Sequence, residues 1–216
     1  MNLNAHSRPR RALVPATLAL LLAPHAAFAQ EEPTLPIHNE EAVTALTRIL
    51  DMDKNLTLRG QGLFVVIAVP YEKGQEAALE SLLRTCRYLA RARYFRGRGL
   101  RHIPVLLKPQ DTAAAFREAL RREEATAVLV PAGLSPASLD AVAQASNEEK
   151  LHTLAMDPTQ VEKWFTVGVE PAPGKMQAVF NADNVRNAEG FFDTHLLRVS
   201  KILNADPNRK KKPQKP

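Results

Sequence analysis

The chain has 216 residues, of which 29 are Lys or Arg and 23 are Asp or Glu, so its formal net charge is +6. The excess lies at the two ends, because residues 1–29 contain three Arg and no acid and residues 209–215 contain five basic residues, which leaves the middle near −2. A slightly acidic body argues against whole-protein binding to nucleic acid. The single cysteine excludes an internal disulfide framework.

Residues 1–29 have the pattern of an export signal. Three arginines precede an apolar stretch, residues 12–26, and Ala27-Phe28-Ala29 then fits the small-x-small cleavage rule. A transmembrane anchor is the alternative, but two prolines interrupt the apolar stretch, which falls short of the roughly 20 residues of a span. We therefore expect cleavage near Ala29, a periplasmic location and a chain that does not itself span the membrane.

The strongest structural signal lies in the sequence GLFVVIAVP, residues 62–70. Before it, residues 30–38 are expected to form a linker, and helical spacing predicts a helix from Asn39 to about Asp53. Within residues 62–70, seven consecutive apolar residues leave no polar face for water. Such a run predicts a parallel strand that is covered on both sides, at the centre of a sheet.

Helices and strands alternate after this strand. This alternation indicates right-handed βαβ units and a mostly parallel sheet. The predicted helices cover residues 75–94, 112–122 (capped by Asp111) and 136–146 (capped by Ser135), the predicted strands cover residues 103–107, 125–130 and 151–155, and a single helical turn follows at Asp157-Pro158.

The pattern changes near the carboxyl terminus. Residues 164–170 and 175–181 are predicted as strands, and the PAPG loop between them is too short for a helical crossover, so they should pair as an antiparallel hairpin. A closing helix is expected over residues 184–203, and residues 205–216 are expected to be a disordered basic tail. We therefore predict one three-layer, Rossmann-like α/β domain over residues 39–204.

No catalytic motif stands out. The turn after the first strand, PYEKGQE, lacks the G-x-G-x-x-G pattern; a phosphate beside Lys73 at the helix N-terminus is one interpretation, and an ordinary surface turn is the other. The four histidines after the leader do not fall at metal-ligand spacing, and Ser135 and Ser138 lack a G-x-S-x-G setting. We expect a non-enzymatic protein with no catalytic residue, cofactor or metal site.

The predicted fold points to a place for a ligand. In open α/β sheets, ligands lie beyond the carboxyl ends of the parallel strands, near the point where the strand order reverses. Two of the predicted strand ends pair proline or glycine with few charges, so an apolar or neutral ligand is as plausible there as an anionic one. The candidate crevice residues are Pro70, Tyr71, Glu72, Lys73, Pro131, Gly133, Met156 and Asp157.

The strongest local charge lies in residues 84–102, where seven arginines alternate with aromatic residues. This arrangement suits an acidic protein face, anionic lipid or a nucleotide phosphate. The alternative is a solvated helix end whose arginines favour the carboxyl-terminal dipole. Cys86 is expected to be a buried thiol, with a reactive or intermolecular cysteine as the alternative. The partner-surface candidates are Arg84, Arg87, Arg91, Arg93, Arg96, Arg98 and Arg101.

The carboxyl-terminal block VGVEPAPGKMQAVFNADNVRNAEGFFDTHLLRVSKIL, together with GLFVVIAV, VLVPAGL and LHTLAMD, resembles the YfiR-like family of exported bacterial proteins. Members show a hairpin that ends in an Asn-containing strand and a following Leu-Leu pattern, which Asn181, Arg186, Leu196 and Leu197 match. The resemblance implies a periplasmic α/β regulator without a known enzymatic activity. The family's namesake represses a membrane diguanylate cyclase through that enzyme's periplasmic region, and thereby controls cyclic-di-GMP and biofilm formation.

We therefore expect a periplasmic regulatory or sensor-accessory protein that binds the extracytoplasmic domain of a membrane signalling protein, with gating by a small ligand left open. A periplasmic solute-binding protein is the alternative, although about 187 residues after cleavage are few for a two-lobed clamp. An exported hydrolase comes third, and its mark would be a nucleophile and a base at hydrogen-bond distance in a cleft. A homodimer is left open.

Overall fold

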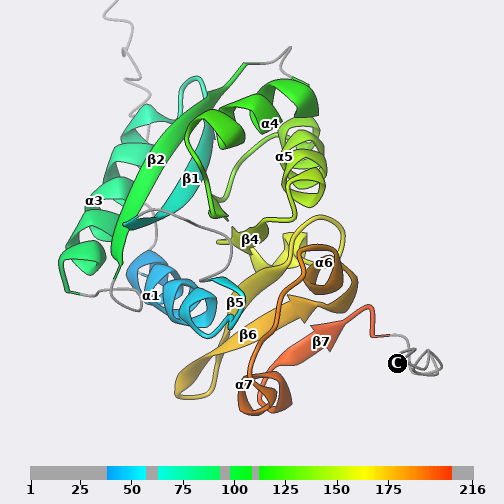
Figure 1. The fold of residues 1–216 in the computed structure, drawn as a ribbon. Helices are drawn as coiled ribbons and strands as arrows, with labels where there is room; N and C mark the ends of the chain where they lie inside the picture. Colours follow the sequence, from blue (N-terminus) through cyan, green and yellow to red (C-terminus); the bar gives the residue numbers. More distant parts are fainter. Residues whose placement is uncertain (1–37, 57–62, 93–97, 109–111, 206–216) are drawn as a thin grey trace, which may run out of the picture. The chain divides into compact units, whose positions relative to one another are not determined.

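The computed structural model describes residues 38–56, 63–92, 98–108 and 112–205. Within them, one seven-stranded sheet has the strand order β2-β1-β3-β4-β5-β6-β7 (Figure 1). Its strands are β1 (Phe64–Glu72), β2 (Gly99–Leu107), β3 (Ala127–Val130), β4 (His152–Ala155), β5 (Val167–Ala172), β6 (Lys175–Asn181) and β7 (Lys201–Leu203). The helical segments are α1 (His38–Asp51), α3 (Glu76–Ala92), α4 (Ala113–Arg122), α5 (Pro136–Glu148), the 3₁₀ turn η1 (Pro158–Gln160), α6 (Ala182–Asn187) and α7 (Thr194–Arg198).

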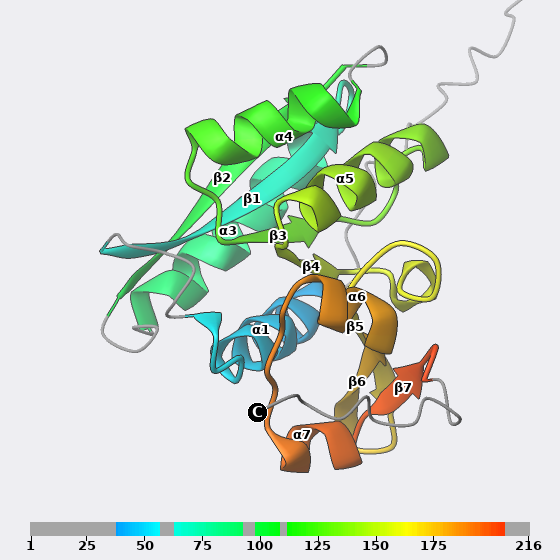
Figure 2. The same ribbon diagram turned by 45° about the vertical axis from the view of Figure 1, so that its right-hand side comes forward.

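Helices cover both faces of the sheet, and each face has its own hydrophobic core. Side chains alternate along β1, so Val65, Ile67 and Val69 pack toward α1 and α3, whereas Ala68 packs toward α4 and α5. Figures 1 and 2 show α4 and α5 together on one face and α3 on the other. The predicted α/β fold is confirmed.

The directions of the strands also follow the prediction. Strands β1 to β5 run parallel to their neighbours, and β6 pairs antiparallel with β5, with Val167 opposite Phe180. The last strand, β7, lies parallel to β6 at the edge of the sheet. The predicted antiparallel hairpin is therefore present.

The strand β1 lies inside the sheet, but it is not covered along its whole length. It pairs with β2 from Phe64 to Glu72 and with β3 only at Ile67 and Ala68. The amino end of the β1–β2 pair consequently extends past β3 (Figure 2). Leu63 and Phe64 are 82% and 50% exposed there. The prediction of a run covered from end to end is wrong for these two residues.

The edge strand β2 is protected by a proline. Gly99 donates its N–H to the carbonyl of Leu63, so alternate residues counted from Gly99 direct their backbone groups toward β1. Pro104 falls in the other set, whose backbone faces away from the sheet. The missing N–H of Pro104 therefore leaves the pairing with β1 intact and interrupts the row of donors that a further strand would need.

The single closing helix predicted over residues 184–203 is wrong, because α6, α7 and β7 share this stretch. Glu189, with φ of +51°, follows the first helix. The N–H of Phe191 then donates to Asp53 Oδ1 at 2.9 Å, which draws the chain out of a helical path. Asp193 starts α7 by accepting the N–H of His195 at 2.8 Å. The apolar residues whose spacing predicted one helix are therefore divided among two helices and a strand.

Several element ends differ from the prediction by a few residues. The strand β2 begins at Gly99 rather than at residue 103, and the N-cap of α4 is Thr112, whose side chain makes no cap bond. Ser135 caps α5 as predicted, since its Oγ accepts the N–H of Ser138 at 3.3 Å. The predicted cap Asp111, residues 1–37 and the tail from residue 206 lie outside the described residues. No helix among the described residues has the length and apolarity needed to cross a bilayer.

Candidate functional site

The strand order places the topological switch point between β1 and β3, where ligands of doubly wound proteins with the order 2-1-3-4-5 lie. In this chain, the carboxylate of Glu72 takes that position. It accepts hydrogen bonds from Ser135 Oγ (2.5 Å), Ser138 Oγ (2.6 Å) and the N–H of Ser135 (3.2 Å), at the amino end of α5. The chain's own carboxylate therefore stands where an anionic ligand would meet the helix N-terminus.

The electrostatics of Glu72 favour its ionised form. Burial raises the pKa of this carboxyl, but the hydroxyls of Ser135 and Ser138 and the N–H of Ser135 together lower it below the ordinary value. An ionised carboxylate with a depressed pKa is a weak base, so it is poorly suited to activate either serine as a nucleophile. The sequence analysis named Glu72 as a crevice residue and did not foresee its serine partners.

The other predicted crevice residues lie along the same edge of the sheet. Gln75 Nε2 donates to the carbonyl of Gly133 at 2.8 Å, which ties the loop after β1 to the loop after β3. Asp157 caps η1 by accepting the N–H of Thr159 at 2.9 Å. Around these bonds lie Pro70 (buried), Tyr71, Pro131 and Met156 (half-buried) and Lys73 (exposed). A ligand at this edge stays a prediction.

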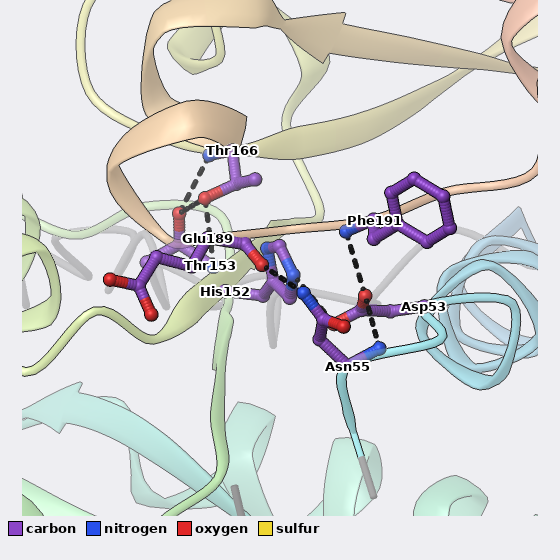
Figure 3. Close-up of polar contacts among 7 residues, drawn as sticks. All are labelled: Asp53, Asn55, His152, Thr153, Thr166, Glu189 and Phe191. Atoms are coloured by element: carbon purple, nitrogen blue, oxygen red, sulfur yellow. Dashed lines mark hydrogen bonds and ion pairs between the residues drawn. The ribbon is translucent and has the colours of Figure 1, made fainter. Parts of the chain in front are cut away.

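A second polar cluster is buried at the start of β4. Asp53 Oδ2 and His152 Nε2 lie 3.0 Å apart, and both side chains are fully buried. Asp53 Oδ1 accepts the N–H groups of Asn55 (3.0 Å) and Phe191 (2.9 Å), as Figure 3 shows. We call these four residues the Asp53 clamp. It joins Asp53, just after α1, to His152 and Phe191, which lie 99 and 138 positions further along the chain.

The hydrogen bonds to Asp53 decide its protonation. Burial raises the pKa of the carboxyl, whereas the bonds from His152, Phe191 and Asn55 lower it, and the net result lies below the ordinary value. An ionised Asp53 accepts from His152 Nε2–H and fixes the orientation of the imidazole. Because neither side chain is exposed, the pair acts as a structural connection.

The surroundings of His152 leave little room. The centre of its ring lies 5.1 Å from the centre of the Phe192 ring, which in turn lies 5.0 Å from the centre of the Phe180 ring. A Cβ on Gly190 would lie 2.5 Å from His152 Cε1, so only glycine fits where this segment passes the ring. Asn55 Nδ2 also donates to the carbonyl of Glu189 at 2.8 Å (Figure 3). The segment after α6 is therefore held against α1 by both packing and hydrogen bonds.

Two threonines continue this polar layer into the next strand. The N–H of Thr166 donates to Thr153 Oγ1 at 2.7 Å, and the two hydroxyl oxygens lie 3.1 Å apart (Figure 3). Both residues are buried. Asp53 and these threonines were not predicted as site residues, because their partners are distant in the chain and the sequence marks them only as polar residues at the end of an apolar pattern.

An open groove of about 980 Å³ lies between α1, the β5–β6 hairpin and α7. Its floor includes the buried side chains of Ile49 and Ala178. Its margin carries exposed charges of both signs, Glu41 and Arg48 from α1 and Lys175 from the hairpin. We call this feature the α1–α7 groove. Its volume lies at the upper end of the roughly 300–1,000 Å³ that ligand sites occupy.

A second hollow of about 610 Å³ adjoins the α1–α7 groove, and Leu196 and Val199 line both. Exposed apolar side chains stand nearby, with Met52 44%, Phe191 55% and Val199 58% exposed. Lys54 Nζ lies 5.1 Å from the centre of the Phe191 ring, a cation–π contact that orders this margin. The region combines apolar surface with charged side chains.

The residues that match the YfiR-like pattern have defined structural roles. Asn181 donates from its amide to two carbonyls just after η1 (3.0 and 2.9 Å) and accepts the N–H of Asp183 at 3.1 Å, so it caps α6. Arg186 pairs with Asp183 at 2.6 Å. Leu196 and Leu197 pack against the core beneath α1. Leu196 also lines the α1–α7 groove.

Of the seven candidate arginines, Arg93 and Arg96 lie outside the described residues. The remaining five lie on α3 and around the start of β2, and they are treated below. Cys86 is fully buried among apolar side chains, and burial raises the pKa of its thiol to about 12. The expectation of a buried thiol is confirmed. Burial likewise lowers the pKa of His102 to about 4, which keeps this imidazole neutral.

Comparison with known proteins gives a likeness of fold. No family model and no curated protein matches the chain. A Streptococcus pneumonia structure described as the ABC domain in complex with L-Trp aligns with TM-score 0.55 and 11% identity over 76% of this chain and 61% of that one. A conserved domain protein from Vibrio cholerae aligns with TM-score 0.53 and 14% identity over 76% and 60%. The chain thus spans about three fifths of these structures, and the likeness shows the fold alone.

Proposed function

We propose that this chain is an exported, non-enzymatic binding protein that holds a small amphipathic molecule in the α1–α7 groove. The observation that carries the proposal is the groove itself, with its apolar floor and exposed charges of both signs. The switch point between β1 and β3 is a weaker candidate, because Glu72 already engages its donors.

The charges at the margin suit a ligand that carries both a cation and an anion. Arg48 and Lys175 would hold a carboxylate, and Glu41 would hold an ammonium group, while the floor receives an apolar group. A free amino acid has all three features. The fold-level likeness to a domain that was crystallised with L-Trp supports this choice of ligand class.

A thermal-shift screen with free amino acids tests the proposal. A ligand present at 100 times its Kd should add about 2.7 kcal/mol to the free energy of unfolding. Arg48→Ala should weaken binding of the best ligand by about tenfold or more, because it removes a charged hydrogen-bond donor. Arg198→Ala is the matched control, since Arg198 is exposed on α7 and does not line the groove. Binding that is indifferent to Arg48→Ala would place the ligand elsewhere.

A second candidate function is the regulatory role that the resemblance to the YfiR-like family implies. In it, the protein binds the extracytoplasmic domain of a membrane signalling protein and thereby regulates cyclic-di-GMP. The exposed apolar side chains of Met52, Phe191 and Val199 favour this candidate, because a protein partner would bury them.

Pull-down from envelope extracts separates the two candidates. If a membrane signalling protein is recovered, Phe191→Ser should abolish the recovery, whereas Leu106→Ser, an exposed apolar change on β2, should leave it unaltered. Phe191→Ser keeps the backbone N–H that bonds to Asp53, so the clamp is preserved. Recovery of no membrane partner, with unchanged cyclic-di-GMP on deletion of the gene, would rule out the cyclase version.

A further inference from the structure

One stretch of the sequence, around the end of α3 and the start of β2, is rich in arginine. Between Glu80 and Asp111 the sequence contains seven arginines and no acidic residue. Five of these arginines belong to the described residues, and all but Arg98, which is half-buried, are exposed. Arg87 pairs with Glu80 at 2.6 Å, at the amino-terminal margin of this stretch. The local field is therefore set by guanidinium groups.

The arginines of α3 share one face with an aromatic residue. Arg84, Arg87 and Arg91 are three and four residues apart, so they stand on the same side of the helix. Tyr88, next to Arg87, is 68% exposed. The face of α3 that points away from the sheet thus combines cations with a solvent-exposed ring.

The apolar part of this end comes from the β1–β2 pair. Leu63 and Phe64 are 82% and 50% exposed where the pair extends past β3, and the Phe64 ring lies over Gly99 of β2. Because β1 and β2 are parallel, α3 runs back along them and ends beside their amino ends (Figures 1 and 2). Tyr88 and Arg91, in the last turns of α3, therefore lie toward the same end as Leu63 and Phe64.

We propose that this end docks on an anionic phospholipid surface. The basic end consists of Leu63, Phe64, Tyr88, Arg91, Arg98 and Arg101, where Tyr88 and Arg91 belong to the α3 side of the sheet and Phe64 and Arg101 belong to the α4 side. Its arginines bind lipid phosphates through their forked donors, and the aliphatic and aromatic side chains enter the boundary between headgroups and acyl chains. Arginine stems lie along apolar surface while the charged heads stay at the phosphates, so both kinds of side chain gain at one interface.

The exposed apolar side chains distinguish a lipid surface from other polyanions. The phosphates of a nucleic acid would bind the arginines and its bases would stack on Tyr88, but it has no apolar region that would bury the aliphatic Leu63. An acidic protein face would likewise place polar groups, not apolar ones, against Leu63 and Phe64. A bilayer interface takes up both the charge and the apolar surface. This inference concerns a region apart from the α1–α7 groove and does not depend on it.

Co-sedimentation of the full chain with vesicles tests the proposal. We expect it to bind vesicles of phosphatidylcholine mixed with phosphatidylglycerol, and to bind phosphatidylcholine vesicles much more weakly. The triple change Arg91→Gln, Arg98→Gln and Arg101→Gln should weaken binding to the mixed vesicles about 100-fold. The control Lys73→Gln, Lys163→Gln and Arg198→Gln removes the same charge from exposed residues elsewhere, and should weaken it by less than about fivefold.

The apolar side chains need a test of their own. Leu63→Ser with Phe64→Ser should weaken vesicle binding while leaving its dependence on salt unchanged, because the phosphate contacts remain. Both residues are exposed, so the melting temperature should stay close to that of the parent chain. Equal effects of the two triple variants would overturn the proposal. So would binding of single-stranded nucleic acid or an acidic peptide that matches vesicle binding and ignores the change at Leu63 and Phe64.

Discussion

The Asp53 clamp and the α1–α7 groove both include parts of α1 with its end and of residues 189–199, yet one is closed and the other open. In the clamp, both oxygens of Asp53 have donors and His152 is fully buried. In the groove, Glu41 and Arg48 remain exposed above an apolar floor. The polar contacts of the clamp fix the position of α1. The side of α1 that stays uncovered forms one wall of the groove.

We expect the largest loss of stability from changes at Asp53, in the clamp. Asp53→Ala should lower the free energy of unfolding by about 3–5 kcal/mol, because it leaves His152 and two backbone N–H groups without their buried acceptor. Asp53→Asn keeps an oxygen for those N–H groups and should cost less than half as much. Urea denaturation followed by circular dichroism measures both variants. Equal losses would show that the charge of Asp53 matters more than its hydrogen bonds.

The packing of the clamp gives the next largest effect. Gly190→Ala should cost about 1–3 kcal/mol, because the new Cβ would meet the ring of His152 in a site fixed by Phe192. Gly190 does not have a positive φ, unlike Gly174, so the loss reports the clash with the ring and not backbone strain. The same denaturation experiment applies. A loss below about 0.5 kcal/mol at Gly190 would mean that the ring can move aside.

Glu72 provides a smaller effect with a pH signature. Glu72→Gln should cost about 1–2 kcal/mol near neutral pH, since the serine donors lose a charged acceptor. The pKa values of Glu72 and Asp53 lie below their ordinary values of 4.5 and 3.8, so their contributions are complete above those values and are lost as the pH falls through the lower folded-state values. The stability difference between the parent chain and Glu72→Gln should therefore shrink in acid. A difference that is independent of pH would contradict the role of the charge.

Changes in the groove should have the smallest effect on stability. Arg48→Ala and Val199→Ser alter exposed side chains, so each should change the free energy of unfolding by less than about 0.5 kcal/mol. Thermal melts without ligand measure this. A cost as large as that of Gly190→Ala would mean that the open region stabilises the fold, and the distinction between clamp and groove would fail.

The fold could largely be predicted from the sequence because its signals are local. The apolar run in β1 and the PAPG loop between β5 and β6 each carry their meaning within a few residues. The prediction of a single closing helix failed because the contact that decides it is not local. What interrupts it is the bond between Phe191 and Asp53, whose partners are 138 positions apart. No periodicity within residues 184–203 contains that information.

The candidate site was predictable only in part, for a related reason. Glu72 was named because strand ends have a fixed place in an α/β sheet, but its partners Ser135 and Ser138 come from another βα unit. The α1–α7 groove depends on how α1 packs against the hairpin, and Arg48 had no distinguishing motif in the sequence. Sites formed by the packing of remote segments require tertiary structure to be recognised.

The bond between Asp53 and Phe191 also predicts an order of folding. Lys54 adds a second link, from its N–H to the carbonyl of Phe191 at 3.0 Å, so the end of α1 is fixed by residues near the far end of the domain. Contacts of such high sequence separation form late, because a long loop must close before they contribute. We therefore expect the first helix of the domain to be synthesised to be among the last to be fully secured. A chain that stops at Asn187 would keep the bond from His152 to Asp53 but lose both backbone bonds to Phe191, so the end of α1 should be held less firmly until the carboxyl-terminal residues are in place.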